Sequence, residues 1–343
     1  PHGLRKQIGK NDHLGLNAAY PATCFPTASA AANSWDEAMI EQMGRRLGAE
    51  TRAQRVGVIL GPGVNIKRSP LCGRNFEYYS EDPLLAGKCA AALIRGVQSN
   101  GIAACVKHFA ANSQETLRMT SDSVMDERTL REIYLPAFEI AVKEGHAKCL
   151  MTSYNMLNGQ YTNENKHLLQ DILTREWDYD GLIVTDWGGD NDRVRGLIAG
   201  NSLEMPGTGG ETDRQILDAV QSGAVERELL DERVARLLRL VSDAESAFGS
   251  APDCDLAEHH EFAARFAEGG CFPHESGIFL GYPLEDVCGF IANKGNHAKL
   301  CGEWKVYGDA HAAARTFHRY TCCRQDYLDR FAVGTTLDSL IVA

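Results

Sequence analysis

Gly181-Leu182-Ile183-Val184-Thr185-Asp186-Trp187-Gly188 is an apolar run that ends in a carboxylate, an aromatic residue and a glycine. Apolar residues on both sides of Val184 suit a strand that is buried on both faces, as strands of parallel sheets are. An acid at the carboxyl end of such a strand emerges where parallel α/β folds place their chemistry. The stretch therefore predicts a buried parallel strand that delivers Asp186 to a candidate active site.

Other short apolar runs also end in polar or glycine-containing loops. The strand candidates are 22–25, 56–60, 103–107, 149–153 and 182–185, with 202–205 as a weaker one. Amphipathic segments typical of helices lie between them, at 35–53, 83–97, 127–143, 167–177, 213–220 and 226–241. This alternation predicts βα units, which fit either an open doubly wound sheet or a (β/α)8 barrel.

The loops after these strands favour the barrel. They carry Gly61-Pro62-Gly63, Gly73-Arg74-Asn75-Phe76-Glu77, Lys107-His108-Phe109, Tyr154-Asn155 and Asp186-Trp187. In a barrel such loops share one rim and converge on a pocket, whereas an open sheet spreads them along an edge. The first loop lacks the glycine spacing and the Lys-Ser/Thr ending of a phosphate loop, which argues against nucleotide binding.

Composition excludes several kinds of partner. The 343 residues carry a net charge of −11, so a basic face for nucleic acid is not expected. No apolar stretch reaches the roughly 20 residues of a membrane span, and no signal-peptide core follows the first residues. The chain does not begin with methionine, which leaves open whether a leader precedes it, and a homo-oligomer also stays open.

Cysteine usage indicates a reducing compartment. The eleven cysteines are odd in number and include no Cys-x-x-Cys, so neither a closed disulfide framework nor a zinc ribbon is predicted. We therefore expect reduced thiols and a cytoplasmic location. The cysteines that lie among apolar neighbours are expected to be small buried hydrophobes; they are Cys24, Cys72, Cys89, Cys105 and Cys149.

Five long motifs resemble the family 3 glycoside hydrolases, most closely their bacterial β-glucosidase branch. They are GPGVNIKRSPLCGRNFEYYSEDP (61–83), KHFAANSQE (107–115), DERTLREIYLPAFEIAVKE (126–144), SYNMLNG (153–159) and VTDWGG (184–189). The likeness covers about residues 1–245. It implies a TIM-like (β/α)8 catalytic barrel, which in that family is followed by an α/β sandwich domain, with the active site between the two.

The resemblance assigns roles to individual residues. Asp186 matches the catalytic nucleophile of a retaining double displacement. Lys107 and His108 match a sugar-gripping pair, and Arg74 matches an arginine that hydrogen-bonds sugar hydroxyls. Tyr154 matches a tyrosine near the nucleophile, although it could instead pack in the core, and Trp187 is open between sugar stacking and core packing. No metal and no cofactor are implied, and no ligand pair ends a strand.

The chain departs from the family pattern in three places. The family's opening Asp-Gly-Pro-His-Gly-Leu-Arg begins here at Pro1, so the sugar-binding aspartate and the first barrel strand are missing and the barrel is expected to be incomplete. Asn201-Ser202 replaces the usual Leu-Asp. The general acid/base is unaccounted for, and Glu77, Glu115 and Glu164 are candidates by position only.

Beyond about residue 260 the likeness ends. We expect a barrel domain at 1–245, a linker or helix at 246–270 and a tail of unassigned, irregular or partly helical fold at 271–343, in which 309–331 is a helix candidate. The tail carries Cys271, Cys288, Cys301, Cys322, Cys323, His274, His297, His311 and His318, without zinc-ligand spacing on both sides. Its abrupt change in composition favours an out-of-frame or recombined reading of the gene.

The sequence thus predicts a β-glucosidase-like hydrolase that releases terminal non-reducing β-D-glucosyl residues from glucosides or oligosaccharides. Its activity is expected to be weak or absent, because only the nucleophile of the two carboxyl groups is identifiable. The alternatives are a β-xylosidase, an N-acetylglucosaminidase of the same family, and a non-catalytic sugar-binding fragment. A metal-dependent barrel hydrolase is disfavoured.

Overall fold

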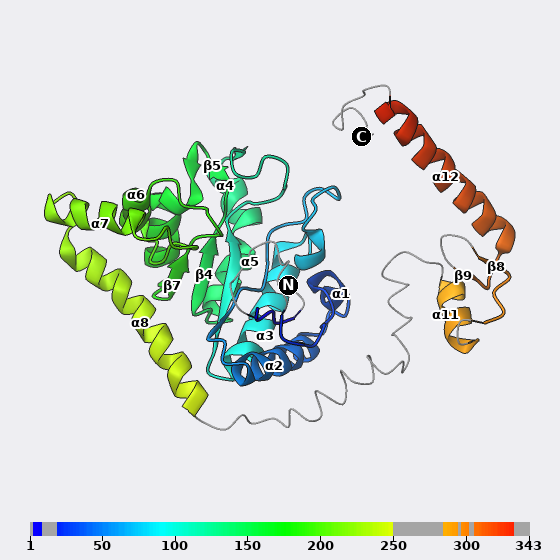
Figure 1. Ribbon diagram of the computed structural model, residues 1–343, viewed down its shortest axis with the longest axis horizontal. Coiled ribbons are helices and arrows are strands. Elements are labelled where there is room, and N and C mark those ends of the chain that lie inside the picture. The colour runs from blue at the N-terminus through cyan, green and yellow to red at the C-terminus, as the bar shows by residue number, and fades with distance from the viewer. Residues whose placement is uncertain (1–2, 9–18, 250–283, 294–295, 302–304, 333–343) are drawn as a thin grey trace. The chain divides into compact units, whose positions relative to one another are not determined.

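The computed structural model describes residues 3–8, 19–249, 284–293, 296–301 and 305–332 (Figure 1). The chain divides into two compact units, Pro1–His260 and Glu261–Ala343, each of which is described by itself. Most of the predicted linker at 246–270 lies outside the described residues. Across the part of the chain that the structure describes, no helix combines the length and the apolar character needed to cross a membrane.

The first unit is built on a parallel sheet whose strands are β1 (Val58–Ile59), β2 (Ala103–Phe109), β4 (Cys149–Thr152) and β7 (Leu182–Val184). The strands lie side by side in chain order, and a bridge from Val184 to Leu203 continues this order by one more segment. A doubly wound sheet reverses its order at a switch point, whereas a barrel does not. The unit is therefore α/β with barrel-like connectivity, although the described strands do not close a complete barrel.

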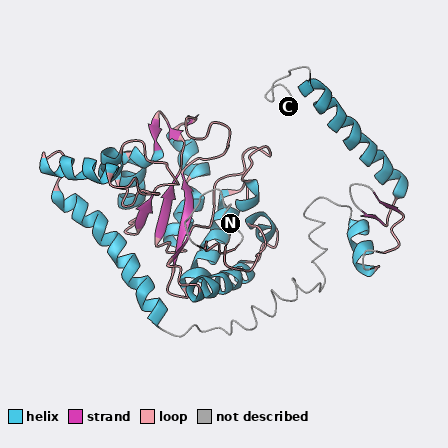
Figure 2. Ribbon diagram, in the orientation of Figure 1, coloured by secondary structure: helices cyan, strands magenta, loops and turns pink. Residues whose placement is uncertain are grey.

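The two faces of this sheet pack against different helices. Ala104 and Val106 of β2 belong to the main core, with residues of α2 (Glu37–Ala53), α3 (Pro83–Gln98), α5 (Pro136–Lys143) and the π-helix η4 (His167–Glu176). Their neighbours in sequence, Ala103 and Cys105, face the other way and pack with Leu240 of α8 (Arg227–Gly249). Apolar side chains of this sheet, whose strands are among the magenta arrows of Figure 2, therefore pack on both of its faces, as the first quoted stretch predicts.

Local chemistry explains where the outer helices begin and how closely they pack. Asp82 caps α3 by accepting a hydrogen bond from the Leu85 amide, and Pro83 occupies the first turn, where no backbone N–H is needed. Helices α2 and α3 cross at Gly96, where an added Cβ would lie 2.1 Å from the Glu41 carbonyl oxygen. Only glycine permits this close approach.

Shorter elements complete the unit. They are α1 (Ala28–Ala32), the 3-10 turns η1 (Asn75–Glu77) and η3 (Thr162–Glu164), α4 (Glu127–Thr129), the π-turn η2 (Leu130–Tyr134), α6 (Arg193–Ala199) and α7 (Glu211–Gln221). A small second sheet joins β3 (Asp122–Ser123), β5 (Met156–Leu157) and β6 (Gln160–Tyr161) beside the carboxyl ends of the main strands.

Four sequence predictions are wrong in detail: the strands at 22–25 and 202–205, the burial of Cys24 and the continuous helix at 127–143. Residues 22–25 form a loop, because the Thr23 amide donates to the side chain of Glu50 at 2.8 Å and pairs with no strand; consequently Cys24 is exposed. The helix expected at 127–143 is broken into α4, η2 and α5, because Pro136 lacks the N–H that a continuous helix needs. Residues 202–205 form a single bridge at Leu203 and no strand.

Within its described residues, the second unit has two helices and a pair of antiparallel strands. They are α11 (Leu284–Ala292), β8 (Leu300–Cys301), β9 (Lys305–Val306) and α12 (Ala310–Ala332), the last of which confirms the helix expected at 309–331. The carboxylate of Asp286 accepts from the amides of Tyr307 and Gly308, both at 2.7 Å, and so ties α11 to the segment that follows β9. Cys271 and His274 lie outside the described residues.

Candidate active site

A β-bulge brings Lys107 and His108 to the same place. Val106 lies opposite Leu150 and Phe109 opposite Thr152, so three steps along β2 match two steps along β4. An extra residue of this kind redirects side chains that would otherwise alternate between the two faces of a sheet. As a result, consecutive side chains of β2 both reach one polar cluster at the carboxyl end of the strands.

Asn65 holds the main chain of the bulge. Its side-chain oxygen accepts from the His108 amide at 2.8 Å, and its side-chain nitrogen donates to the His108 carbonyl at 2.9 Å. Asn65 is 2% exposed. Its two hydrogen bonds satisfy the buried main-chain N–H and carbonyl of His108 in place of bonds to a neighbouring strand. The loop after β1 thereby fixes a residue of β2.

Glu77 is the buried anion of the cluster. It accepts from Nε of Arg74, and its other oxygen lies 3.3 Å from Nζ of Lys107. Burial alone would raise the pKa of the Glu77 carboxyl, but the positive charges of Lys107 and Arg74 outweigh it and hold the pKa at about 2. The carboxylate therefore orients both cations and is unsuited to donate a proton near neutral pH.

His108 joins this group to Asp186. Its Nε2 lies 2.8 Å from Nη2 of Arg74 and 3.5 Å from Oδ2 of Asp186, and its Nδ1 lies 3.2 Å from the hydroxyl of Tyr78. Burial, together with the nearby charges of Lys107 and Arg74, lowers the pKa of the imidazole well below its usual range. The ring is therefore neutral, and its contact with Asp186 is not an ion pair.

One carboxylate oxygen of Asp186 accepts a hydrogen bond, and the other, called its open oxygen below, accepts none from the described residues. Oδ1 accepts from the Trp187 amide at 2.7 Å. Oδ2 is buried and has no hydrogen-bond partner among the described residues. A buried carboxylate oxygen without a donor is costly unless a ligand supplies one.

Tyr154 and Trp187 complete the group that the sequence predicts. The Tyr154 hydroxyl donates to the Trp187 carbonyl at 2.7 Å, and Trp187 contacts Asp186 through its main-chain amide. Burial and the charge of Asp186 raise the pKa of Tyr154 to about 12, so the phenol keeps its proton. The structure thus brings together Arg74, Lys107, His108, Tyr154, Asp186 and Trp187 through a chain of direct contacts. Sugar stacking by the Trp187 ring stays a prediction.

Arg118 is a member of the site that sequence reasoning missed. Its guanidinium lies 4.6 Å from the centre of the Tyr154 ring, and it pairs with Glu115 at 2.7 Å. The signal was present, since Arg118 lies just past the motif at 107–115. A lone arginine in a long loop is nevertheless more often simply solvated. Only the fold places it over Tyr154.

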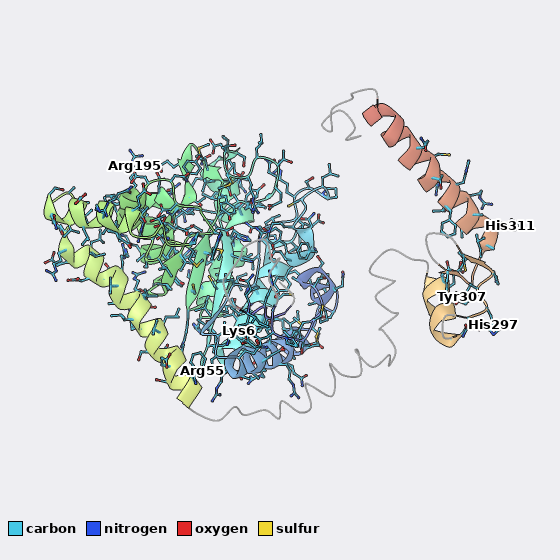
Figure 3. All side chains as sticks on the ribbon, viewed as in Figure 1. Lys6, Arg55, Arg195, His297, Tyr307 and His311 are labelled. Carbon is cyan, nitrogen blue, oxygen red and sulfur yellow. The ribbon has the colours of Figure 1, made fainter. Side chains whose placement is uncertain are left out.

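The other acid candidates differ in their surroundings. Glu115 forms an ion pair with Arg118. Glu164 on η3 lies 3.9 Å from the exposed Arg195, which is labelled in Figure 3. Burial and the nearby Asp192 charge raise the pKa of Glu164. Asp190, which sequence reasoning did not single out, accepts from Asn163 at 3.0 Å, and burial raises its pKa to about 6.

A cavity of about 480 Å³ lies away from this cluster. It is lined at the amino ends of β4 and β7 by residues that include Lys148, Trp177, Leu182 and Arg236, and by none of the cluster residues. Within the described ranges, no group of three or more His, Cys, Asp or Glu side chains could hold a metal ion. The candidate site is the polar cluster around Asp186, which is defined by its direct contacts.

The first unit is similar in sequence to a family of known proteins. Residues 10–240 match the model of the glycosyl hydrolase family 3 N terminal domain. The chain is 51% identical over 267 residues to thermostable beta-glucosidase B of Acetivibrio thermocellus, covering 78% of this chain and 35% of that protein. It is 46% identical over 248 residues to an exo-alpha-(1->6)-L-arabinopyranosidase of Bifidobacterium longum, covering 72% and 32%.

A solved structure shares the fold. The Bifidobacterium adolescentis GH3 beta-glucosidase aligns with a TM-score of 0.69 at 44% identity, over 76% of this chain and 37% of that chain. The chain thus spans about a third of the length of the curated relatives it matches.

The tail matches something different. A model described as a protein of unknown function (DUF3793) matches residues 197–341 and overlaps the first match over 197–240. A tail that is similar to another family argues against the out-of-frame reading of the gene and agrees with the recombined reading.

Proposed function

The chain belongs to glycosyl hydrolase family 3, and we propose that Asp186 is the nucleophile of a β-glucosidase-like retaining reaction. In such a reaction a carboxylate attacks the anomeric carbon and forms a covalent glycosyl-enzyme, which water then hydrolyses. The substrate would be a terminal non-reducing β-D-glucosyl residue of a glucoside or oligosaccharide.

The open oxygen of Asp186 carries this proposal. Oδ1 is held by the Trp187 amide, which fixes the plane of the carboxylate, while Oδ2 is buried and unpartnered among the described residues. A nucleophile needs this combination of fixed orientation and an oxygen free to form a bond. The Tyr154 phenol keeps its proton and donates it to the Trp187 carbonyl beside the carboxylate.

The surrounding groups suit one sugar ring. Arg74 and Lys107 present cationic N–H donors that are oriented by Glu77, and His108 adds a neutral ring nitrogen. Charge-assisted hydrogen bonds from such donors bind vicinal hydroxyls in a fixed orientation. We assign Arg74, Lys107, His108, Tyr154 and Trp187 to substrate binding, with no cofactor.

The organisation of the chain is part of the proposal. We propose that residues 1–245 form the greater part of a TIM-like barrel, and that 246–270 form a linker or helix before a tail of unassigned fold at 271–343. We also propose that the protein is cytoplasmic. Free thiols support the reducing compartment, since none of the described cysteines is in a disulfide. Gel filtration coupled to light scattering distinguishes a monomer from a homo-oligomer.

A fluorosugar experiment tests the nucleophile. The full chain is incubated with 2,4-dinitrophenyl 2-deoxy-2-fluoro-β-D-glucoside, whose leaving group departs without protonation, so the unidentified acid is not needed. Mass spectrometry should show one fluoroglucosyl group, and peptide mapping should place it on Asp186. Asp186→Asn should stay unlabelled, whereas Asp192→Asn, in the same loop, should label normally. A folded wild-type protein that takes up no label contradicts the proposal.

A pentopyranosidase is the second candidate, because one relative at 46% identity is named an arabinopyranosidase. Aryl β-D-glucoside, β-D-xyloside, α-L-arabinopyranoside and N-acetyl-β-D-glucosaminide are compared at equal concentration. The glucoside should react fastest. If no glycoside reacts but glucose binds by calorimetry, the chain is a sugar-binding fragment.

A further inference from the structure

The hydrogen-bond partners of His108 determine which of its ring nitrogens carries the proton. A neutral imidazole has one N–H donor and one acceptor nitrogen. Arg74 Nη2 lies 2.8 Å from Nε2, and a guanidinium can only donate. Nε2 must therefore be the acceptor, which leaves the proton on Nδ1.

Tyr78 supplies the acceptor for that proton. Its hydroxyl oxygen lies 3.2 Å from Nδ1, and the two rings meet edge to face, with centroids 6.2 Å apart at 81°. His108 is 1% exposed, so water cannot take over this role without a rearrangement. A buried N–H without an acceptor would be strongly disfavoured.

The Tyr78 ring is itself held firmly in place. It is fully buried, and its hydroxyl also accepts from Nδ2 of Asn112 at 3.4 Å. Gly63 lies against the ring, since an added Cβ there would come within 2.9 Å of two ring carbons. Gly63 forms one β-bridge to Tyr78 and another to Lys107, where the bulge begins. The tyrosine is therefore positioned by the same residue that pairs with the bulge.

We propose that Tyr78 is a positioning residue that fixes His108 in the Nδ1–H form, with Nε2 presented as a hydrogen-bond acceptor beside Asp186. Nε2 then offers no proton to Oδ2 of Asp186 at 3.5 Å, which agrees with the lack of a donor to that oxygen among the described residues. The nucleophile keeps its open oxygen, and Nε2, whose single lone pair accepts from Arg74, presents no proton to a sugar hydroxyl. This consequence for the sugar rests on the proposed function, whereas the protonation state does not.

Nitrogen NMR tests the proposal without substrate. The full chain is labelled with 15N-histidine, and the His108 ring signals are identified by their loss in His108→Asn. In the wild type, Nδ1 should give a protonated, pyrrole-type signal and Nε2 an unprotonated, pyridine-type signal. A wild-type spectrum with the proton on Nε2 overturns the assignment.

Tyr78→Phe tests the role of the hydroxyl. Loss of one hydrogen bond of ordinary strength should change the ratio of the two protonation forms at least about fivefold toward Nε2–H. Tyr79→Phe is the matched control, because Tyr79 is buried beside it and packs in the main core; it should leave the ratio unchanged. An unchanged ratio in folded Tyr78→Phe rules out Tyr78 as the positioning residue. If that variant does not fold, the wild-type spectrum still decides the proton position.

The labelling rate connects this inference to the reaction. Tyr78→Phe should take up the fluorosugar label about tenfold more slowly than Tyr79→Phe, the equivalent of about 1.4 kcal/mol. The two proposals fail separately. A wild type with Nδ1–H and no label refutes the glycosidase function alone, whereas a labelled wild type with Nε2–H refutes the role of Tyr78 alone.

Discussion

Oδ2 of Asp186 lies 3.5 Å from Nε2 of His108, and within the part of the chain that the structure describes no group donates a hydrogen bond to that oxygen. Both atoms are acceptors, because the His108 ring is neutral and Arg74 already donates to Nε2. Nε2 has its donor in Arg74, whereas the buried oxygen of Asp186 is stabilised only when a donor comes beside it. Under the proposed function, a hydroxyl of the bound sugar would supply this donor.

Glu77→Gln should destabilise the fold. Loss of the carboxylate leaves the buried Lys107 and the partly buried Arg74 without their counterion, a change that typically costs about 3–5 kcal/mol. The control is Glu81→Gln, which is exposed and should change the free energy of unfolding by no more than about 0.5 kcal/mol. Urea denaturation at pH 7 measures both.

The effect of Glu77→Gln should depend on pH. The pKa of Glu77 is about 2 in the folded protein and 4.5 ordinarily, so its ionisation stabilises the fold fully above about pH 4.5. That contribution is lost as the pH falls through 4.5 toward 2. The difference in unfolding free energy between wild type and variant should therefore shrink between pH 5 and pH 3. A difference that stays constant over this range contradicts the ion-pair account.

Asp190→Asn should raise the free energy of unfolding near neutral pH, whereas Glu77→Gln lowers it. Burial raises the pKa of Asp190 from 3.8 to about 6, so the folded state holds the proton more tightly than the unfolded state does. Stability is then highest below about pH 4 and falls as the pH rises through 6. The variant avoids this loss and keeps an amide oxygen for the Asn163 donor. We expect it to be more stable than wild type by about 2 kcal/mol at pH 8 and nearly equal at pH 4.

Thermal or urea unfolding across pH 4 to 8 measures this difference. Asp192→Asn is the control, because Asp192 lies in the same loop, is exposed and caps α6 with an oxygen that asparagine retains. It should leave the pH dependence of the wild type in place. If Asp190→Asn is less stable than wild type at pH 8, the carboxylate is needed by Arg193, 3.8 Å away, and the prediction is wrong.

The sequence was sufficient to predict the strand that carries Asp186 and the group around it. Leu182, Ile183 and Val184 are buried on both faces of the sheet, and periodicity together with the following polar residues indicates this directly. The loops after β1, β2, β4 and β7 do converge, so Arg74, His108 and Asp186 meet although they are far apart in the chain. Chain order in the sheet made this convergence predictable.

What could not be predicted depends on tertiary contacts. The strand expected at 22–25 is a loop because Thr23 binds a side chain of α2, a contact that no local pattern shows. The bulge at Lys107 and His108 depends on the register between β2 and β4. The hydrogen bonding of Asn65 to the His108 main chain depends on the path of the loop after β1. Tyr78 looked like one more aromatic residue in a long motif. Its contact with Nδ1 of His108 appears only once both are in place.

Arg118→Ala should weaken sugar binding more than it weakens the fold. The guanidinium is partly exposed, so the loss of its contact with the Tyr154 ring and its pair with Glu115 should cost about 1 kcal/mol of stability. The labelling rate should fall further than that of Arg128→Ala, an exposed control whose partner Glu132 lies one helical turn away. Equal labelling rates in the two variants would show that Arg118 serves the fold alone.

Asn65→Ala should disturb both the fold and the site. It removes the donor and the acceptor that bind the His108 main chain and leaves a buried N–H and a buried carbonyl without partners, at a cost of about 2–4 kcal/mol. Because the main chain of the bulge then loses both hydrogen bonds to Asn65, the His108 ring should also shift. This shift should lower the rate at which Asp186 is labelled. Asn65→Asp keeps the acceptor for the His108 amide and should recover part of the stability. Asn33→Ala, which removes an exposed side-chain donor to the Ser29 carbonyl, is the control. Urea denaturation and the labelling rate are measured on all three variants. If Asn65→Ala loses stability but labels at the wild-type rate, the hydrogen bonds of Asn65 support the strand without positioning the histidine.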